Sequence, residues 1–288
     1  MDYYGVIGNP VAHSKSPFIH ERFAQLTQQE LIYERIECPI GEFKAKIEHL
    51  QASYQYGSAT SSNQNGYELK GCNVTIPFKQ DAFDLATRHS ARALLAQACN
   101  TLKFEDGKIL ADNTDGLGLV RDIQINAKFP IKGKKVLLLG AGGAAAGALG
   151  PLIEAMPQQI TIANRTLSKA EQLCLTHAPL AKLHQVQLVA NSFQAVGNSY
   201  DLLINATASS LAGEPVPVDG SVLSPQALGY DMMYGPNAQA FLEWVELHGG
   251  VARDGLGMLV EQAAEAFYIW RGVRPDSARV LQEMRQRV

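Results

Sequence analysis

The chain has 288 residues, with 25 Lys plus Arg, 28 Asp plus Glu and a formal net charge of −3. This length exceeds the ~150 residues of a typical single domain, so we expect two domains that share a cleft. Basic residues are scattered rather than gathered into runs, which argues against nucleic acid or an anionic membrane as partner and favours a small-molecule substrate.

Short apolar runs alternate with amphipathic segments along most of the chain. This alternation predicts parallel sheets built from βαβ units, and therefore an α/β fold. The expected strands cover residues 4–7, 32–36, 72–75, 136–139, 160–163, 202–205 and 230–232. Glu105-Asp106-Gly107 predicts a hairpin between 101–104 and 108–111, which would add an antiparallel edge strand to the first sheet. Residues 57–66, rich in Ser, Asn, Gln and Gly, predict a surface loop.

The passage between the domains is expected at residues 113–116, which open a helical stretch over 117–125. We therefore expect a first domain over 1–114 and a second domain over 115–254. Two helices are predicted after the last strand, over 257–271 and 275–286. We expect the segment 255–288 to return to the first domain.

Cysteine spacing and the N-terminal residues bear on the cellular compartment and on metal binding. The four cysteines form neither a C-x-x-C pair nor a zinc-ligand spacing with His, so we expect reduced thiols and no metal site. Met1 is not followed by a basic and apolar leader, and no apolar run reaches the ~18 residues of a membrane span. We expect a cytoplasmic protein, either a monomer or a homodimer.

The strongest single motif follows the apolar run at 136–139. That run ends in Gly140-x-Gly142-x-x-Ala145, a pattern typical of a buried strand that turns into a helix whose first amides face a pyrophosphate. The next strand ends in Asn164 and Arg165, where an acidic residue would be expected beside a free ribose 2′-hydroxyl. A guanidinium fits a 2′-phosphate instead, so the sequence favours NADP over NAD.

Two hydroxyls precede the first predicted helix. Ser14 and Ser16 stand just before Pro17, which suits the first turn of a helix. Serines at such a position cap helices, but a cap needs only one hydroxyl. We therefore expect this pair to hold a substrate carboxylate with help from the helix dipole.

Acid–base groups are expected near the end of the strand at 72–75. Lys79 is the only lysine next to the polar cluster that includes Asn73 and Thr75, and it becomes a general acid or base near neutral pH only if burial lowers its pKa. Asp115 opens the helix at the domain passage, either as an ordinary acid of a first helical turn or as a catalytic partner of Lys79. Asn100 sits at a strand start, where capping is the simplest role.

Taken together, the motifs resemble the shikimate dehydrogenase family over nearly the whole chain. Each motif alone gives modest support for this resemblance, but the order and spacing of all of them together are specific to the family. They are Gly-Asn-Pro-Val-Ala-His-Ser-Lys-Ser-Pro at 8–17, Asn-Val-Thr-Ile-Pro-Phe-Lys at 73–79, Asn-Thr-Asp-Gly at 113–116, Gly-Ala-Gly-Gly-Ala at 140–144, Asn-Arg-Thr at 164–166, Asn-Ala-Thr at 205–207, Tyr-Asp-Met-Met-Tyr at 230–234 and Asp-Gly-Leu-Gly-Met-Leu-Val-Glu-Gln-Ala-Ala at 254–264.

The resemblance implies an N-terminal α/β substrate domain, a Rossmann-like NADP domain and reversible, NADPH-dependent reduction of 3-dehydroshikimate to shikimate in aromatic amino-acid biosynthesis. It implies that Lys79 and Asp115 are the acid–base pair. The implied substrate-binding residues are Ser14, Ser16, Thr75, Asn100, Tyr234 and Gln262. The implied cofactor-binding residues are Gly140, Gly142, Gly143 and Ala144 at the pyrophosphate, Asn164, Arg165, Thr166 and Lys169 at the ribose phosphate, and Met232 and Gly255 at the nicotinamide.

The chain departs from the family pattern in a few places. Lys169 stands where many relatives have Arg, which keeps the charge and loses the planar fork. Ala91 replaces an acidic residue, Gln239 replaces Thr, and the loop at 57–66 is longer than usual. None of these changes alters Lys79 or Asp115.

Two alternatives remain open from the sequence. A quinate/shikimate dehydrogenase paralogue would oxidise quinate with NAD or NADP, but the paralogue often carries an acidic residue near the ribose, where this chain has Asn164 and Arg165. A non-catalytic NADP-binding sensor would need no acid–base pair, so the presence of Lys79 and Asp115 argues against it.

Overall fold

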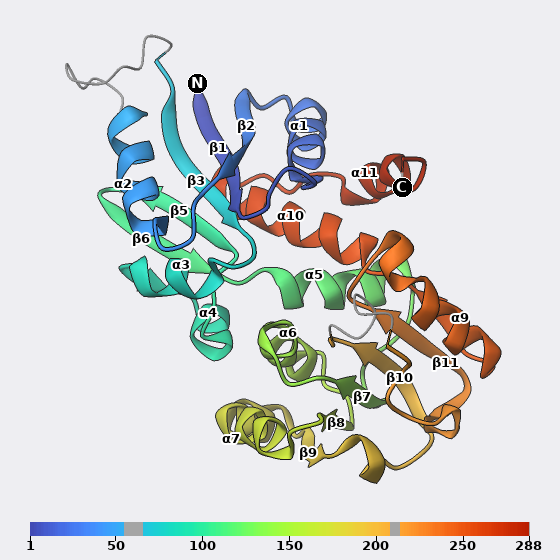
Figure 1. The fold of residues 1–288 in the computed structure, drawn as a ribbon. Coiled ribbons are helices and arrows are strands. Elements are labelled where there is room, and N and C mark those ends of the chain that lie inside the picture. Colours follow the sequence, from blue (N-terminus) through green and yellow to red (C-terminus); the bar gives the residue numbers. More distant parts are fainter. Residues whose placement is uncertain (55–65, 208–213, 288) are drawn as a thin grey trace. The chain divides into compact units, whose positions relative to one another are not determined.

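Two six-stranded sheets with flanking helices form two structural units of the chain (Figure 1). The computed structural model describes residues 1–54, 66–207 and 214–287. Unit 1 comprises Met1–Thr114 and Gln262–Val280, and unit 2 comprises Asp115–Glu261 and the residues from Leu281 onward. The loop predicted at 57–66 lies outside the described residues except for Gly66.

The sheet of unit 1 has the strand order β2-β1-β3-β5-β6-β4. Its strands are β1 (Asp2–Gly8), β2 (Leu31–Glu37), β3 (Glu68–Val74), β4 (Arg88–His89), β5 (Thr101–Glu105) and β6 (Lys108–Asp112). The helices between them are α1 (Ser16–Thr27), α2 (Phe43–Ser53), α3 (Lys79–Leu85) and α4 (Ala91–Ala96). β1 pairs in parallel with both β2 and β3, as the alternating pattern predicts.

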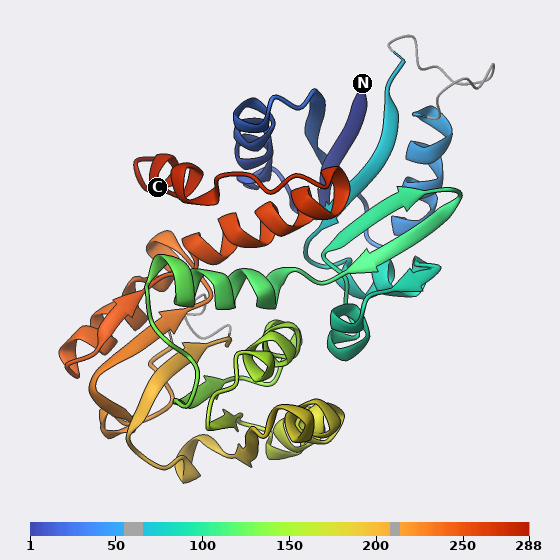
Figure 2. The ribbon, with the colours of Figure 1, turned by 180° about the vertical axis from the view of Figure 1, so that it is seen from behind.

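The predicted hairpin forms between β5 and β6, and Figure 2 shows it from behind. Its turn places Asp106 and Gly107 at positive φ angles of 50° and 69°, the conformation that an Asp-Gly turn adopts readily. The expectation that this hairpin forms the edge of the sheet is wrong. The short strand β4 pairs with β6 and forms the edge, so the hairpin lies inside the sheet.

Both faces of the unit 1 sheet are covered by helices (Figure 1). On one face, Tyr4, Val6 and Tyr33 pack with Ala266 and Trp270 of α10 (Leu256–Arg271). On the other face, the side chains of Tyr3, Ile7 and Cys72 from β1 and β3 pack against α2 and the segment that leads into α3. Those two elements contribute Phe43, Ile47 and Phe78 to the cluster. The helices thereby hold the loops at the carboxyl ends of β1 and β3 in place.

The sheet of unit 2 is parallel throughout and has the order β12-β11-β10-β7-β8-β9. Its strands are β7 (Lys135–Leu139), β8 (Gln159–Ala163), β9 (Gln187–Asn191), β10 (Tyr200–Asn205), β11 (Leu223–Asp231) and β12 (Val251–Arg253). Read in chain order this is 3-2-1-4-5-6 from β9, the doubly wound arrangement of dinucleotide-binding folds. The strand order reverses between β7 and β10, and ligands bind such folds at that point.

Helices pack on both faces of this sheet. They are α5 (Asp115–Arg121), which continues as the π-helix η1 (Asp122–Asn126), α6 (Gly143–Glu154), α7 (Leu167–His184) and α9 (Gln239–Leu247), with short 3-10 turns η2 (Phe193–Ala195), η3 (Gly220–Val222) and η4 (Gly235–Ala238).

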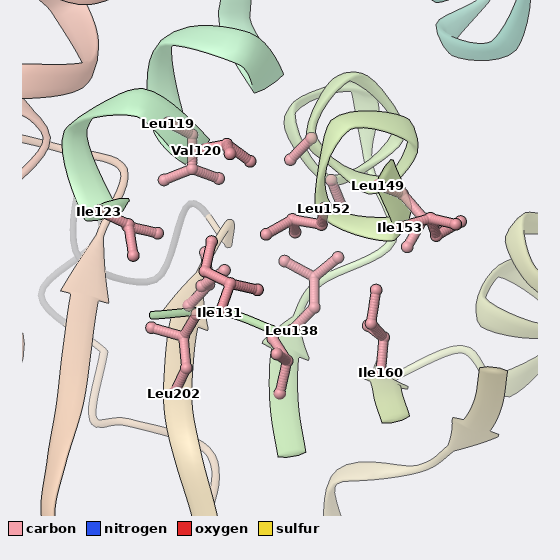
Figure 3. Close-up of a cluster of buried hydrophobic side chains, with 14 of the residues drawn as sticks. Leu119, Val120, Ile123, Ile131, Leu138, Leu149, Leu152, Ile153, Ile160 and Leu202 are labelled. Atoms are coloured by element: carbon pink, nitrogen blue, oxygen red, sulfur yellow. The ribbon is translucent and has the colours of Figure 1, made fainter. Parts of the chain in front are cut away.

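The central strand β7 is buried on both of its faces. Figure 3 shows the cluster on one face, where Leu138 packs beneath α5 and α6. Leu137 and Leu139 point to the opposite face and pack with Phe241 and Val245 of α9. Burial on both sides explains why this strand reads as an uninterrupted apolar run.

The two C-terminal helices form as predicted, as α10 and α11 (Ser277–Arg285). The division of the chain differs from the expected ranges. Residues 262–280 group with unit 1, whereas residues 255–261 and those from Leu281 onward group with unit 2. The segment that returns to unit 1 is therefore shorter than 255–288.

Within the described ranges, no helix has the length and hydropathy needed to cross a bilayer. The same residues contain no group of three or more His, Cys, Asp or Glu side chains placed to hold a metal ion.

Candidate functional site

In unit 1, the loops that carry the predicted substrate residues are joined by backbone hydrogen bonds. Thr75 N–H, just after β3, donates to Ile7 O of β1 at 2.9 Å, and Asn9 N–H donates to Ile76 O at 3.0 Å. Because parallel strands end at the same edge of a sheet, the residues after β1 and β3 lie side by side. This edge of the sheet brings together the segments of Ser14 and Thr75.

The serine pair lies where β1 leads into α1. Ser16 is the first residue of α1 and is buried, and Ser14 is half-buried. Lys15 occupies the N-cap position without a side-chain cap bond, so neither hydroxyl serves as a conventional cap. Ser14 Oγ accepts the Ser16 N–H at 3.3 Å, and the Arg35 guanidinium donates twice to Ser14 O, at 3.0 and 2.7 Å. Arg35, which the sequence analysis missed, thus fixes the loop that presents the two hydroxyls.

Lys79 is the first residue of α3, and its side chain is half-buried. Its carbonyl accepts the Cys99 N–H at 2.9 Å. The Asn100 carbonyl in turn accepts the Val74 N–H at 2.8 Å. These bonds tie the lysine loop to the residues that precede β5.

Two amide side chains meet next to this loop. Asn100 and Gln262 are both buried, and Asn100 Nδ2 donates to Gln262 Oε1 at 3.3 Å. Asn100 Nδ2 also donates to Thr114 Oγ1 at 3.0 Å. Unit 1 therefore contains six of the predicted residues, with Asn100 and Gln262 in direct contact; the six are Ser14, Ser16, Thr75, Lys79, Asn100 and Gln262.

In unit 2, the glycine-rich turn lies at the carboxyl end of β7, where the strand order reverses. Gly140 has φ of 102°, and a Cβ there would be 3.0 Å from Ala206 O. A Cβ at Gly142 or Gly143 would instead meet nothing within 4 Å. The turn needs Gly140 for its own conformation, whereas the other two glycines leave open space through which a phosphate can approach the backbone of the α6 N-terminus, beside Ala144.

Two exposed cations follow β8: Arg165 in the turn after the strand, and Lys169 in the first turn of α7. Neither forms an ion pair with any residue in the described ranges. Asn164 Nδ2 donates to Thr166 O at 2.8 Å, and Lys169 N–H donates to the same carbonyl at 3.1 Å, which shapes the turn into α7. Two cations without carboxylate partners beside a glycine-rich turn fit the extra phosphate of NADP.

Met232 and Gly255 come from distant parts of the chain but lie together in unit 2. Gly255 N–H donates to Met233 O at 2.8 Å, and Met232 N–H donates to Asn205 O at 3.1 Å. Tyr234 follows directly, and its half-burial raises the pKa of the phenol. The structure thus joins three predicted residues at the end of β11.

Asp115 begins α5 and is half-buried. The next residue, Gly116, packs so closely on α6 that a Cβ would lie 2.2 Å from Gly147 O. This close approach of two helices fixes the backbone from which the Asp115 carboxylate projects.

A buried ion pair that the sequence analysis missed supports the Gly255 turn. Asp122, fully buried in η1, accepts from Arg253 Nε at 2.8 Å and from Arg253 Nη2 at 2.6 Å. The Tyr230 hydroxyl donates to Asp122 Oδ2 at 2.8 Å. Burial, as the main cause, and the nearby Asp122 charge, as the second, raise the pKa of Tyr230 well above its usual range. Gly257 packs directly on the Asp122 carboxylate.

A second missed pair shapes the ends of β10 and β11. Asn205 Nδ2 donates to Asp231 Oδ2 at 3.0 Å, and Asp231 Oδ1 accepts the Met233 N–H at 2.8 Å. The sequence offered a signal for both residues, since they lie inside two of the quoted motifs, but it did not indicate that they bond to each other.

Family models match three parts of the chain. Residues 6–102 match the shikimate dehydrogenase substrate binding domain, 124–213 match shikimate / quinate 5-dehydrogenase, and 255–286 match the shikimate 5′-dehydrogenase C-terminal domain. A shikimate dehydrogenase (NADP(+)) from Acidovorax ebreus is 56% identical over 284 residues, which cover 99% of this chain and 96% of that protein. The chain belongs to the shikimate dehydrogenase family.

Solved structures agree with this assignment. An Ael1 enzyme from Pseudomonas putida superposes with a TM-score of 0.85 at 44% identity and covers 98% of both chains. A shikimate 5-dehydrogenase from Thermus thermophilus, crystallised with NADP(H) and shikimate, gives a TM-score of 0.80 at 26% identity over the full length of both chains. The α/β fold with a Rossmann-like unit is therefore that of the shikimate dehydrogenase family.

Proposed function

We propose that this protein is an NADP-dependent shikimate dehydrogenase, which reduces 3-dehydroshikimate to shikimate and runs in reverse with NADP+. The observation that carries this proposal is the joined set of loops in unit 1, where buried Asn100 and Gln262 contact each other beside the segment that carries Lys79. Such a set suits a small ring that carries hydroxyls and a carboxylate.

The substrate is held by complementary polar groups. Ser14 and Ser16 bind the carboxylate from the start of α1, and Thr75, Asn100, Gln262 and Tyr234 bind the ring hydroxyls. Amides both donate and accept hydrogen bonds, so they suit hydroxyl groups, which do the same. A substrate lacking one of these hydroxyls would leave a buried amide atom unpaired, which is a strong basis for discrimination.

The cofactor site in unit 2 would be formed by the glycine turn, the cations after β8 and the backbone near Met232 and Gly255. Gly140, Gly142, Gly143 and Ala144 present the pyrophosphate site, and Asn164, Arg165, Thr166 and Lys169 present the site of the 2′-phosphate. When bound, NADPH supplies the hydride for the ketone carbon.

Lys79 and Asp115 form the acid–base pair of this proposal. Lys79 donates a proton to the ketone oxygen during reduction and takes it back from the alcohol during shikimate oxidation. Asp115 holds the ammonium group in place for this transfer. Reduction thus adds one proton to oxygen for each hydride added to carbon.

A cofactor and substrate panel tests the proposed function. The purified protein is assayed by NADPH absorbance with 3-dehydroshikimate, and in reverse with shikimate or quinate and either NADP+ or NAD+. We expect kcat/KM to be highest for shikimate with NADP+. Equal turnover of quinate, or a preference for NAD+, would support the quinate/shikimate dehydrogenase paralogue instead.

A further inference from the structure

A buried histidine begins a chain of polar contacts within unit 1. His20 of α1 is fully buried, and its ring stacks on that of Tyr33 with centroids 4.2 Å apart and planes 8° from parallel. His20 Nε2 lies 3.1 Å from Asn73 Oδ1, and the Tyr33 hydroxyl donates to the same oxygen at 2.7 Å. The other rings around His20 are those of Phe23, Phe267 and Trp270.

The orientation of the Asn73 amide follows from its partners. Asn73 Nδ2 lies 3.3 Å from Asn100 O and 3.2 Å from Thr101 Oγ1. A main-chain carbonyl only accepts hydrogen bonds, so the amide nitrogen of Asn73 must face it. The amide oxygen therefore faces His20 and Tyr33, and His20 must carry its hydrogen on Nε2.

The same logic continues to the proposed substrate residues. Thr101 Oγ1 accepts from Asn73 and donates its own hydrogen to Asn100 Oδ1, which lies 2.9 Å away. Asn100 Oδ1 also accepts the Thr114 N–H at 2.9 Å, so Asn100 Nδ2 faces Thr114 Oγ1 and Gln262 Oε1. Two main-chain groups, Asn100 O and Thr114 N–H, thereby fix the direction of the bonds that run from His20 through Asn73 to Asn100 and Gln262.

His20 carries an energetic cost at this position. Its second nitrogen, Nδ1, is buried and hydrogen-bonds to none of the described residues. An unsatisfied buried polar atom costs about 1–3 kcal/mol, and a phenylalanine would fill the same aromatic cluster without that cost. A residue that costs stability in a packed cluster points to a role outside folding.

We propose that His20 is a positioning residue: by holding Asn73 it holds the Asn100 carbonyl and the Thr101 hydroxyl, and so keeps the amides of Asn100 and Gln262 in place for the hydroxyls of the substrate ring. This inference rests on the proposed function. With the oxygen of Asn73 held by two donors, its Nδ2 stays on Asn100 O and Thr101 Oγ1, which supports the backbone and the hydroxyl beside the Asn100 amide. The expected consequence is selectivity for a ring whose hydroxyls match that fixed pattern of donors and acceptors.

Two variants test the proposal while keeping the aromatic packing. His20→Phe removes the donor and the unpaired nitrogen, and Tyr33→Phe removes the hydroxyl that shares the Asn73 oxygen and also hydrogen-bonds Ser16. We expect each to raise the KM for shikimate by about three- to tenfold, the loss of one buried hydrogen bond, and to change the KM for NADP+ by less than about twofold. Thermal unfolding should show that His20→Phe is at least as stable as the wild type.

His177 provides the matched control. It is a buried histidine of α7 in unit 2, it bonds to Leu173 O through Nδ1, and its Nε2 likewise has no partner among the described residues. His177→Phe should leave the KM for shikimate unchanged. If His20→Phe does not fold, nitrogen NMR of the wild-type His20 ring decides the test, because Tyr33→Phe also removes a hydrogen-bond partner of Ser16.

The outcomes separate this inference from the proposed function. A wild type that does not turn over shikimate with NADP+ would refute both. If the wild type is active but the folded variants keep the wild-type KM for shikimate, the role of His20 is overturned and the proposed function stands. Equal increases in the KM values for shikimate and NADP+ would have the same meaning. Nitrogen NMR of the wild type gives a readout independent of activity: we expect a neutral His20 ring protonated at Nε2 near pH 7, and a ring protonated at Nδ1 alone would contradict the proposal.

Discussion

The backbone of Gly255 packs against the carbonyl group of Met232, so that a Cβ at position 255 would lie 2.3 Å from Met232 O. The two residues are distant in sequence, yet this contact and the bond from Gly255 N–H to Met233 O hold their backbones in one arrangement. Only glycine permits such an approach without displacement of the neighbouring strand end.

Gly255→Ala should therefore disturb the backbone that we assign to the nicotinamide end of the cofactor. We expect kcat/KM with NADPH to fall by at least about tenfold, because small displacements of positioning groups have large effects on reaction rate. Steady-state kinetics together with thermal unfolding provide the check. A folded variant with wild-type kinetics would show that this backbone does not position the cofactor.

The glycines of the turn after β7 should separate stability from binding. Gly140→Ala forces a side chain into φ of 102° close to Ala206 O, and we expect a loss of about 1–2 kcal/mol in the free energy of unfolding. Gly142→Ala meets no atom within 4 Å and should change stability by less than about 0.5 kcal/mol. Its affinity for NADP+ should nevertheless fall.

Urea unfolding and NADP+ titration of both variants measure these two effects. If Gly142→Ala bound NADP+ as tightly as the wild type, the open space at this turn would not be the path of the pyrophosphate.

Arg165 should determine the preference for NADP+ over NAD+. Arg165→Gln removes a charge-assisted bond to the 2′-phosphate, so we expect the KM for NADP+ to rise by about tenfold or more and the KM for NAD+ to stay nearly constant. Lys182→Gln is the matched control. Lys182 is also an exposed cation, but it lies in the last turn of α7, whereas Arg165 precedes the first turn of that helix. Equal effects of the two substitutions would indicate a general electrostatic contribution in place of a specific phosphate contact.

His20 should make stability depend on pH. Burial lowers the pKa of His20 to about 3, against 6.5 in the unfolded chain, so between these values the unfolded state binds one more proton than the folded state. Stability is then lost as pH falls below about 6.5, and a single such group contributes about 1.4 kcal/mol between pH 7.5 and 5.5. In urea unfolding, His20→Phe should lose about 1.4 kcal/mol less stability than the wild type between pH 7.5 and 5.5. An equal loss in both proteins would contradict the lowered pKa of His20.

Elements with strong local patterns could be predicted from the sequence. The apolar run of β7 and the Asp-Gly turn of the β5–β6 hairpin each follow from a few adjacent residues. The strands β9 and β12 were not predicted, because β9 is half-exposed with mixed side chains and β12 has only three residues. The edge position of β4 depends on pairing that two residues cannot signal.

The site was predictable where motifs carry it and hidden where distant side chains meet. The sequence singled out Lys79 and Asn100 from their neighbours, and the family resemblance added Gln262. The pairing of Asp122 with Arg253, by contrast, joins positions 131 residues apart. No local periodicity encodes such a contact, because it arises only when η1 and β12 are packed. The catalytic and binding roles of the individual residues remain predictions for experiment.

The most direct test of the whole account is the rate of NADPH oxidation with 3-dehydroshikimate, measured for the wild type and for Lys79→Met. We expect ready turnover by the wild type and a loss of about 10²–10⁴-fold in kcat for the variant, the usual contribution of a general acid, with NADPH binding and thermal stability retained. A folded Lys79→Met enzyme that kept the wild-type rate would contradict it.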